Sequence, residues 1–271
     1  MTAQTGDRQV QMRVFGLTGA LSVAQSDDWN GRLTINILSV PAQAKVGYLF
    51  YSGITEVLID YSQYHNDAQT SNEQVDRMSV TQGIPMIFLA PAAVFGSGGE
   101  YSDIYSESGS NLLNSAIDQI VELFGPVELV LVGQSAGGMM VANLLPKRND
   151  IRCAVISSAP LDLVAHEQFS HAHSQFLGSA SPMNPIEQIA SIPHIEQRHI
   201  YIGYSLTDQI VNSSYQIEYA ERLAEHGHAV TLESAPPADM WGHDIVGWRY
   251  NQMFECAGRN NRRTSPSALS D

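Results

Sequence analysis

Short apolar runs alternate with segments of helical periodicity over most of the chain. Six of these runs are typical of buried strands: VGYLF at 46, PMIFLA at 85, VELVLV at 127, CAVISS at 153, HIYIGY at 199 and AVTLES at 229. Strands that alternate with helices predict an α/β fold, with a mostly parallel central sheet and helices on both faces.

Two further apolar segments stand at the N-terminal end, before this alternation begins. They are QMRVFGLTGALSV and RLTINILSV, and the polar turn material AQSDDWNG separates them. Apolar segments joined by such a turn are typical of antiparallel strands. We therefore expect the sheet to begin with antiparallel strands.

Three segments carry apolar residues at helical spacing. Residues 111–125 place a stripe on one face and end at a Gly-Pro pair, 136–145 carry a similar stripe that ends at Pro146, and 212–227 end at a glycine. Glycine and proline commonly follow the last turn of a helix. These three segments are expected to be helices that pack on the sheet.

The chain is expected to form one domain over 1–257. Residues 160–198 interrupt the alternation and are rich in His, Ser, Pro and Met, so we interpret them as a small cap-like insertion. Residues 258–271 have almost no apolar content and are expected to be a mobile tail.

The composition and charge of the chain argue against nucleic acid and membranes as partners. The chain has 271 residues, is 44% hydrophobic and carries a formal net charge of −14, so a polyanion such as nucleic acid would be repelled. No stretch is long and apolar enough for a membrane span, and no secretory signal is visible. The expected location is cytoplasmic, and assembly into a homo-oligomer is compatible with the sequence.

Two cysteines, Cys153 and Cys256, are too few for a disulfide framework or a four-thiolate metal site. We predict that both are reduced thiols, with a single bridge between them as the alternative. His166, His171 and His173 lie close together in the sequence, but no carboxylate or cysteine pattern accompanies them. We expect them to line or shield an entrance rather than to bind a metal, and we expect no cofactor.

The stretch VELVLVGQSAGGMMVANLL places Ser135 between an apolar strand and a helix. Glycines two residues on either side, at 133 and 137, allow a sharp strand-to-helix turn. In this GxSxG pattern a serine can be held as a nucleophile, with the amide of Ala136 directed at a developing oxyanion. An ordinary strand-to-helix turn is the alternative interpretation.

A catalytic serine needs a histidine that accepts its proton and a carboxylate that orients the histidine. Asp208 follows the strand HIYIGY, and His243 lies in MWGHDIVGW, after the final strand. Loops at the carboxyl ends of parallel strands meet at one edge of the sheet, where these side chains could converge. Asp162, one strand earlier, is the competing acid, and a helix-start residue is the alternative role of Asp208.

The motifs GQSAGG, GYSLTDQIV and GHD, in this chain order, resemble those of the α/β-hydrolase superfamily. The similarity extends over about residues 46–255 and is strongest to the prolyl-oligopeptidase-like and dienelactone-hydrolase-like branch. It implies a nucleophile at Ser135, a base at His243, an acid at Asp208 and an oxyanion hole formed partly by Ala136.

The resemblance also implies a second oxyanion donor after the third strand of the fold. This chain has LFYSGI there, and some relatives of the oligopeptidase branch use a tyrosine hydroxyl at this place. Tyr51 is therefore the candidate, with simple packing as its alternative role. Phe169 and Phe176, within the cap-like insertion, are the candidates for contact with an apolar substrate.

These features together predict a serine hydrolase that cleaves a carboxylic ester of a small acyl substrate through an acyl-enzyme. An ester is preferred because oligopeptidases of this branch tend to carry a separate gating domain, which the single predicted domain does not include. A peptide or amide bond is the alternative. A lyase or a non-catalytic binding protein of the same fold are the rivals from other classes.

Overall fold

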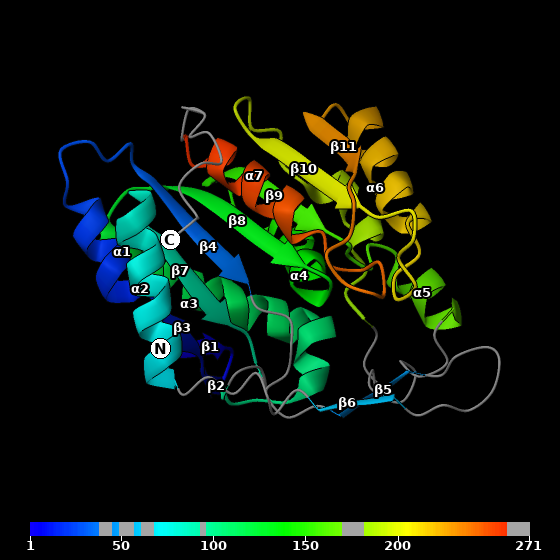
Figure 1. Ribbon diagram of the computed structural model, residues 1–271, viewed down its shortest axis with the longest axis horizontal. Coiled ribbons are helices and arrows are strands. Elements are labelled where there is room, and N and C mark those ends of the chain that lie inside the picture. Colours follow the sequence, from blue (N-terminus) through cyan, green and yellow to red (C-terminus); the bar gives the residue numbers. More distant parts are fainter. Residues whose placement is uncertain (38–44, 49–56, 61–67, 93–95, 170–181, 259–271) are drawn as a thin grey trace, which may run out of the picture.

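The computed structural model describes residues 1–37, 45–48, 57–60, 68–92, 96–169 and 182–258 (Figure 1). Its centre is a seven-stranded sheet with the strand order β11-β10-β9-β8-β4-β7-β3. In chain order the strands are β3 (Arg13–Phe15), β4 (Arg32–Ile37), β7 (Met86–Ala90), β8 (Glu128–Gln134), β9 (Ile151–Ser157), β10 (His199–Tyr204) and β11 (Val230–Ser234). All neighbouring pairs are parallel except β3 with β7.

Helices cover both faces of this sheet, as predicted. Figure 1 shows α1 (Leu17–Ala24), α2 (Ala68–Gln82) and α7 (Val246–Cys256) over one face. The other face is covered by α3 (Glu107–Phe124), α4 (Ala136–Leu144) and α6 (Ser214–Glu225). The short helix α5 (Leu163–Phe169) follows β9, and the hairpin of β1 (Thr2–Thr5) and β2 (Arg8–Gln11) packs against α3.

Strand β8 shows why the central strands are continuous apolar runs. Leu129 and Leu131 belong to the large core under α3 and α4, whereas Val130 and Val132 belong to the smaller core under α7. Successive side chains of a strand point to opposite faces, so a strand with helices on both sides needs apolar residues at every position. The apolar runs at 85, 127, 153, 199 and 229 correspond to β7–β11.

The expected antiparallel start of the sheet is only partly right. Strand β3 does pair antiparallel with β7, but the segment after it forms the helix α1. The small residue Gly19 lets α1 lie against α2, because a Cβ there would stand 2.5 Å from the Asp76 carbonyl oxygen. This close helix contact favours a helix over the strand that the apolar pattern predicted.

Strand β4, also predicted as antiparallel, is a central parallel strand. Its last residue, Ile37, pairs with Leu89 of β7 on one side and with Gly133 of β8 on the other. We also expected VGYLF to be a strand of this central sheet. Strand β5 (Lys45–Tyr48) instead pairs antiparallel with β6 (Val57–Asp60) in a separate two-stranded sheet.

The second half of the predicted cap-like insertion packs on the main core. Its two short 3₁₀ helices are Pro185–Glu187 and Ile189–Ser191, and Ile186, Ile189 and Ile192 are buried among the core residues. Residues 170–181 of this insertion and 259–271 of the predicted tail lie outside the described residues. The division into one domain, a cap-like insertion and a tail therefore stays a prediction.

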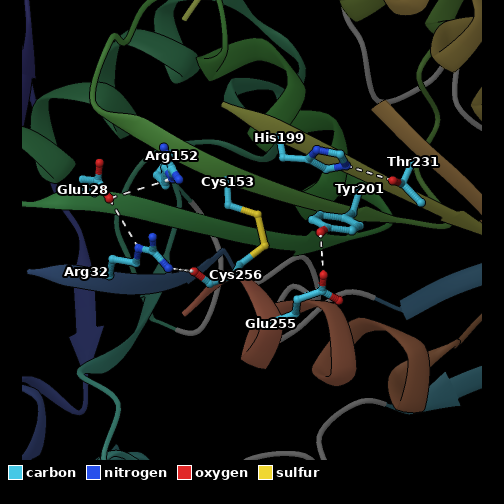
Figure 2. The surroundings of a disulfide bond; sticks show 9 residues. All are labelled: Arg32, Glu128, Arg152, Cys153, His199, Tyr201, Thr231, Glu255 and Cys256. Atoms are coloured by element: carbon cyan, nitrogen blue, oxygen red, sulfur yellow. Dashed lines mark hydrogen bonds and ion pairs between the residues drawn. A yellow bond between two sulfur atoms is a disulfide. The ribbon is translucent and has the colours of Figure 1, made fainter. Parts of the chain in front are cut away.

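The prediction of two reduced thiols is wrong, because Cys153 and Cys256 form a disulfide (Figure 2). Cys153 belongs to β9 and Cys256 is the last residue of α7, so the bond ties this helix to the middle of the sheet. The two cysteines are 103 residues apart in the sequence, so local patterns could not predict their contact. The contact arises because α7 packs over β9. No described helix combines the length and the apolar character needed to cross a membrane.

Candidate active site

Ser135 occupies a sharp turn between β8 and α4. Its backbone has φ 53° and ψ −127°, a left-handed region that L-residues rarely adopt and that marks a strained turn. Gly133 is required nearby, since a Cβ there would lie 2.3 Å from the carbonyl oxygen of Gly137. The Ser135 amide donates to the carbonyl of Ser157 over 2.9 Å, which anchors the turn on β9.

Ala136 is the first residue of α4. Amides in the first turn of a helix have no acceptor within the helix, and the helix dipole places partial positive charge there. The Ala136 N–H is thus one of the amides at the N-terminal end of α4, directly after Ser135. The role of this amide in an oxyanion hole stays a prediction.

Asp208 and His243 form a hydrogen bond between two separate loops. The Nδ1 atom of His243 lies 2.9 Å from Oδ2 of Asp208, and the two side chains are 11% and 2% exposed. The second carboxylate oxygen accepts the amides of Ile210 and Val211, each over 2.9 Å. A carboxylate can only accept here, so Nδ1 carries the proton and Nε2 is left as the basic nitrogen.

The two loops that carry this pair are in direct contact. A Cβ at Gly242 would lie 2.1 Å from the carbonyl oxygen of Thr207, so only glycine allows the loops to approach this closely. The amide of Gln209 also donates to the carbonyl of Trp241 over 3.0 Å. These contacts hold the acid and the histidine at a constant separation.

Asp162, the competing acid, has different partners. Its Oδ1 accepts the amide of Ala165 over 3.2 Å in the first turn of α5, and the side chain of Asn184 over 3.2 Å. These are the contacts of a helix-start residue. The structure thus joins Asp208, and not Asp162, to His243.

Two residues near the site were not predicted from the sequence. Asp239 accepts the amides of His243 and Asp244 over 2.7 and 3.1 Å and so shapes the histidine loop. Arg249, on α7, donates to both Gln134 and Asp244. An acid four residues before a loop histidine is a signal that could have indicated Asp239, but Arg249 has no sequence signal.

The other predicted site residues either lie outside the described residues or differ from the prediction. Tyr51 and Phe176 lie outside the described residues, as does the side chain of Phe169. The strand on which the Tyr51 prediction relied is not part of the central sheet. His166 is buried, with its ring edge-on to Tyr215 at 5.9 Å between centroids, and so does not line an entrance.

His171 and His173 also fall outside the described residues. Within the part of the chain that the structure describes, no three His, Cys, Asp or Glu side chains gather in a way that could hold a metal ion.

No protein-family model matches the sequence, and no curated protein matches it significantly. Solved structures match its fold. An esterase of Pyrococcus furiosus has a TM-score of 0.58 at 13% identity, over 95% of this chain and 89% of its own. An acylaminoacyl peptidase of Pyrococcus horikoshii has a TM-score of 0.57 at 12% identity, over 94% of this chain but only 39% of its own.

A Xanthomonas campestris protein, described as an α/β serine hydrolase without a lid, has a TM-score of 0.50 at 12% identity, over 96% of this chain and 93% of its own. Identities this low carry information about the fold only. The parallel sheet, the turn at Ser135 and these neighbours agree on one architecture, and the chain has the α/β-hydrolase fold.

Proposed function

We propose that this protein is a serine hydrolase that cleaves a carboxylic ester through an acyl-enzyme intermediate. Ser135 is the nucleophile, His243 the general base and acid, and Asp208 the carboxylate that orients the histidine. The observation that carries the proposal is the Asp208–His243 hydrogen bond of 2.9 Å, formed on the same edge of the sheet as the strained turn at Ser135.

In the first half of the reaction, Ser135 Oγ attacks the ester carbonyl carbon while His243 Nε2 takes the hydroxyl proton. The negative charge that develops on the carbonyl oxygen is stabilised by the Ala136 amide. The tetrahedral intermediate then expels the alkoxide, which takes the proton from His243 and leaves as an alcohol. The acyl group remains on Ser135.

In the second half, His243 removes a proton from water as the water attacks the acyl carbon. The acid is released and the proton returns to Ser135. Asp208 stabilises the imidazolium that forms twice in this cycle and keeps the Nδ1 proton in place. We assign only the Ala136 amide to the oxyanion hole, because the strand before Tyr51 does not belong to the central sheet.

An ester is the preferred substrate bond because the Pyrococcus furiosus esterase is matched over 89% of its length. The peptidase match covers 39% of that protein. A peptide or amide bond is the second candidate, supported by the same peptidase match. A binding protein of this fold has no need of an activated serine, so covalent labelling separates it from a hydrolase, whereas a lyase would keep the triad and is separated by the absence of ester and anilide turnover.

The test is intact-protein mass spectrometry after treatment with a fluorophosphonate, together with turnover of nitrophenyl acyl esters and the matching anilides. We expect one adduct on Ser135 that disappears in Ser135→Ala and His243→Ala. The control is His226→Ala, since His226 follows the end of α6 and bonds only to its own helix in the described structure. Labelling without ester turnover, but with anilide turnover, would favour the amide; no adduct would contradict a serine hydrolase.

A further inference from the structure

Arg249 connects the turn that carries Ser135 with the loop that carries His243. Its Nη1 atom lies 2.6 Å from Oε1 of Gln134 and 3.2 Å from Oδ1 of Asp244. Gln134 is the last residue of β8 and immediately precedes Ser135, whereas Asp244 immediately follows His243. One guanidinium nitrogen therefore bonds to the neighbours of both the serine and the histidine.

The chemistry of these groups fits the two bonds. Nη1 of an arginine carries two hydrogens, so it can donate one to each acceptor at the same time. The bond to the Asp244 carboxylate is also an ion pair, and the side chain of Arg249 is only 15% exposed. Partial burial strengthens such a bond, because less water competes for the charge.

The helix that carries Arg249 is itself firmly attached to the sheet. The indole of Trp248 lies directly on the β10 backbone, where a Cβ at Gly203 would stand 2.4 Å from the ring. At its far end, α7 is linked to β9 by the disulfide of Cys256, which Figure 2 shows. Arg249 thus projects from a rigid element, and this makes it a suitable reference point for two loops.

We propose that Arg249 is a positioning residue that sets the location of the His243 loop relative to the turn at Ser135. This inference rests on the proposed function, since it concerns the alignment of the serine and histidine side chains. Arg249 acts through Gln134 and Asp244 and does not itself touch the reacting atoms. Without it, the histidine loop would still bond to Asp208 but would lose its link to β8.

The test compares Arg249→Met with wild type in the rate constant of fluorophosphonate labelling and in ester turnover. Misplacement by about 1 Å can cost on the order of 100-fold in rate. We expect the labelling rate and kcat to fall by about 10- to 100-fold, with KM nearly unchanged. Arg249→Lys should restore part of the loss, because lysine keeps the charge but lacks the rigid fork of donors.

A matched control is Arg222→Met, which removes an arginine from an exposed ion pair with Glu218 on α6. It should label at the wild-type rate. Circular dichroism at the assay temperature measures the folded fraction of each variant. If Arg249→Met fails to fold, Asp244→Ala breaks only one of the two bonds and should give a smaller loss of the same kind.

Coupling is measured with Gln134→Leu and the double variant. If Arg249 acts through Gln134, the double variant should lose less than the product of the two single losses. Labelling of folded Arg249→Met at the wild-type rate would overturn the positioning role while leaving the proposed function intact. A wild-type protein that is not labelled at all would overturn both.

Discussion

Asp208 and Asp162 each follow a strand of the sheet, yet their side chains have different partners. Asp208 bonds to His243, whereas Asp162 accepts the Ala165 amide at the start of α5. Asparagine still bonds the histidine ring but holds the wrong tautomer, so Asp208→Asn should lower kcat by roughly 10³- to 10⁴-fold. Asparagine serves a helix start as well as aspartate does, so Asp162→Asn should be nearly silent.

Steady-state kinetics on the same nitrophenyl ester would measure both variants, with thermal unfolding as the control for folding. The two substitutions make the same chemical change, so only the position differs. A large loss in Asp162→Asn with little change in Asp208→Asn would reverse the assignment of the acid.

At the scale of elements, the helix α7 depends on its disulfide to the sheet. The bond closes a loop over a separation of 103 residues, and a loop of this size reduces the entropy of the unfolded chain substantially. Cys256→Ser should lower the free energy of unfolding by about 2–5 kcal/mol. Urea unfolding followed by circular dichroism would measure this loss.

A thiol reductant is the matched treatment. It should lower the stability of the wild-type protein to that of Cys256→Ser and should leave the variant unchanged. If the reductant has no effect on the wild-type protein while mass spectrometry shows both thiols free, the disulfide does not contribute to stability.

The stability of the whole molecule should also depend on pH through two histidines on β10 and next to β11. Burial lowers the pKa of His199, against the attraction of Glu255. Burial also lowers the pKa of His228, and the charges of His194, Arg198 and His226 lower it further.

In both cases the unfolded chain binds a proton more readily than the folded one. Their contribution is complete above the ordinary imidazole value of 6.5 and is lost as the pH falls through 6.5 toward the folded pKa. The thermal midpoint should therefore rise as the pH increases toward about 6.5 and level off above it. His228→Gln should flatten this rise, and an equal slope in that variant would contradict the role of His228.

Local hydrophobic patterns correctly predicted the elements that are covered in the same way along their whole length. Strands β7–β9 carry long apolar runs because helices cover both of their faces, and α3 carries one apolar stripe because it packs on the sheet with only one face. The prediction was wrong for α1, whose packing depends on a close contact with another helix. The apolar pattern of the α1 segment predicted a strand, because the pattern does not reveal that Gly19 packs closely against α2.

The sequence by itself determined the α/β class, the turn at Ser135 and the chain order of Ser135, Asp208 and His243, because these depend on local periodicity and on glycines two residues before and after the serine. Only the tertiary structure decided that β4 is a central strand beside β8, that β5 lies outside the central sheet and that Cys153 meets Cys256. It also decided that Asp208 rather than Asp162 reaches His243. Each of these depends on packing between distant segments, and residue spacing does not encode which distant surfaces fit together.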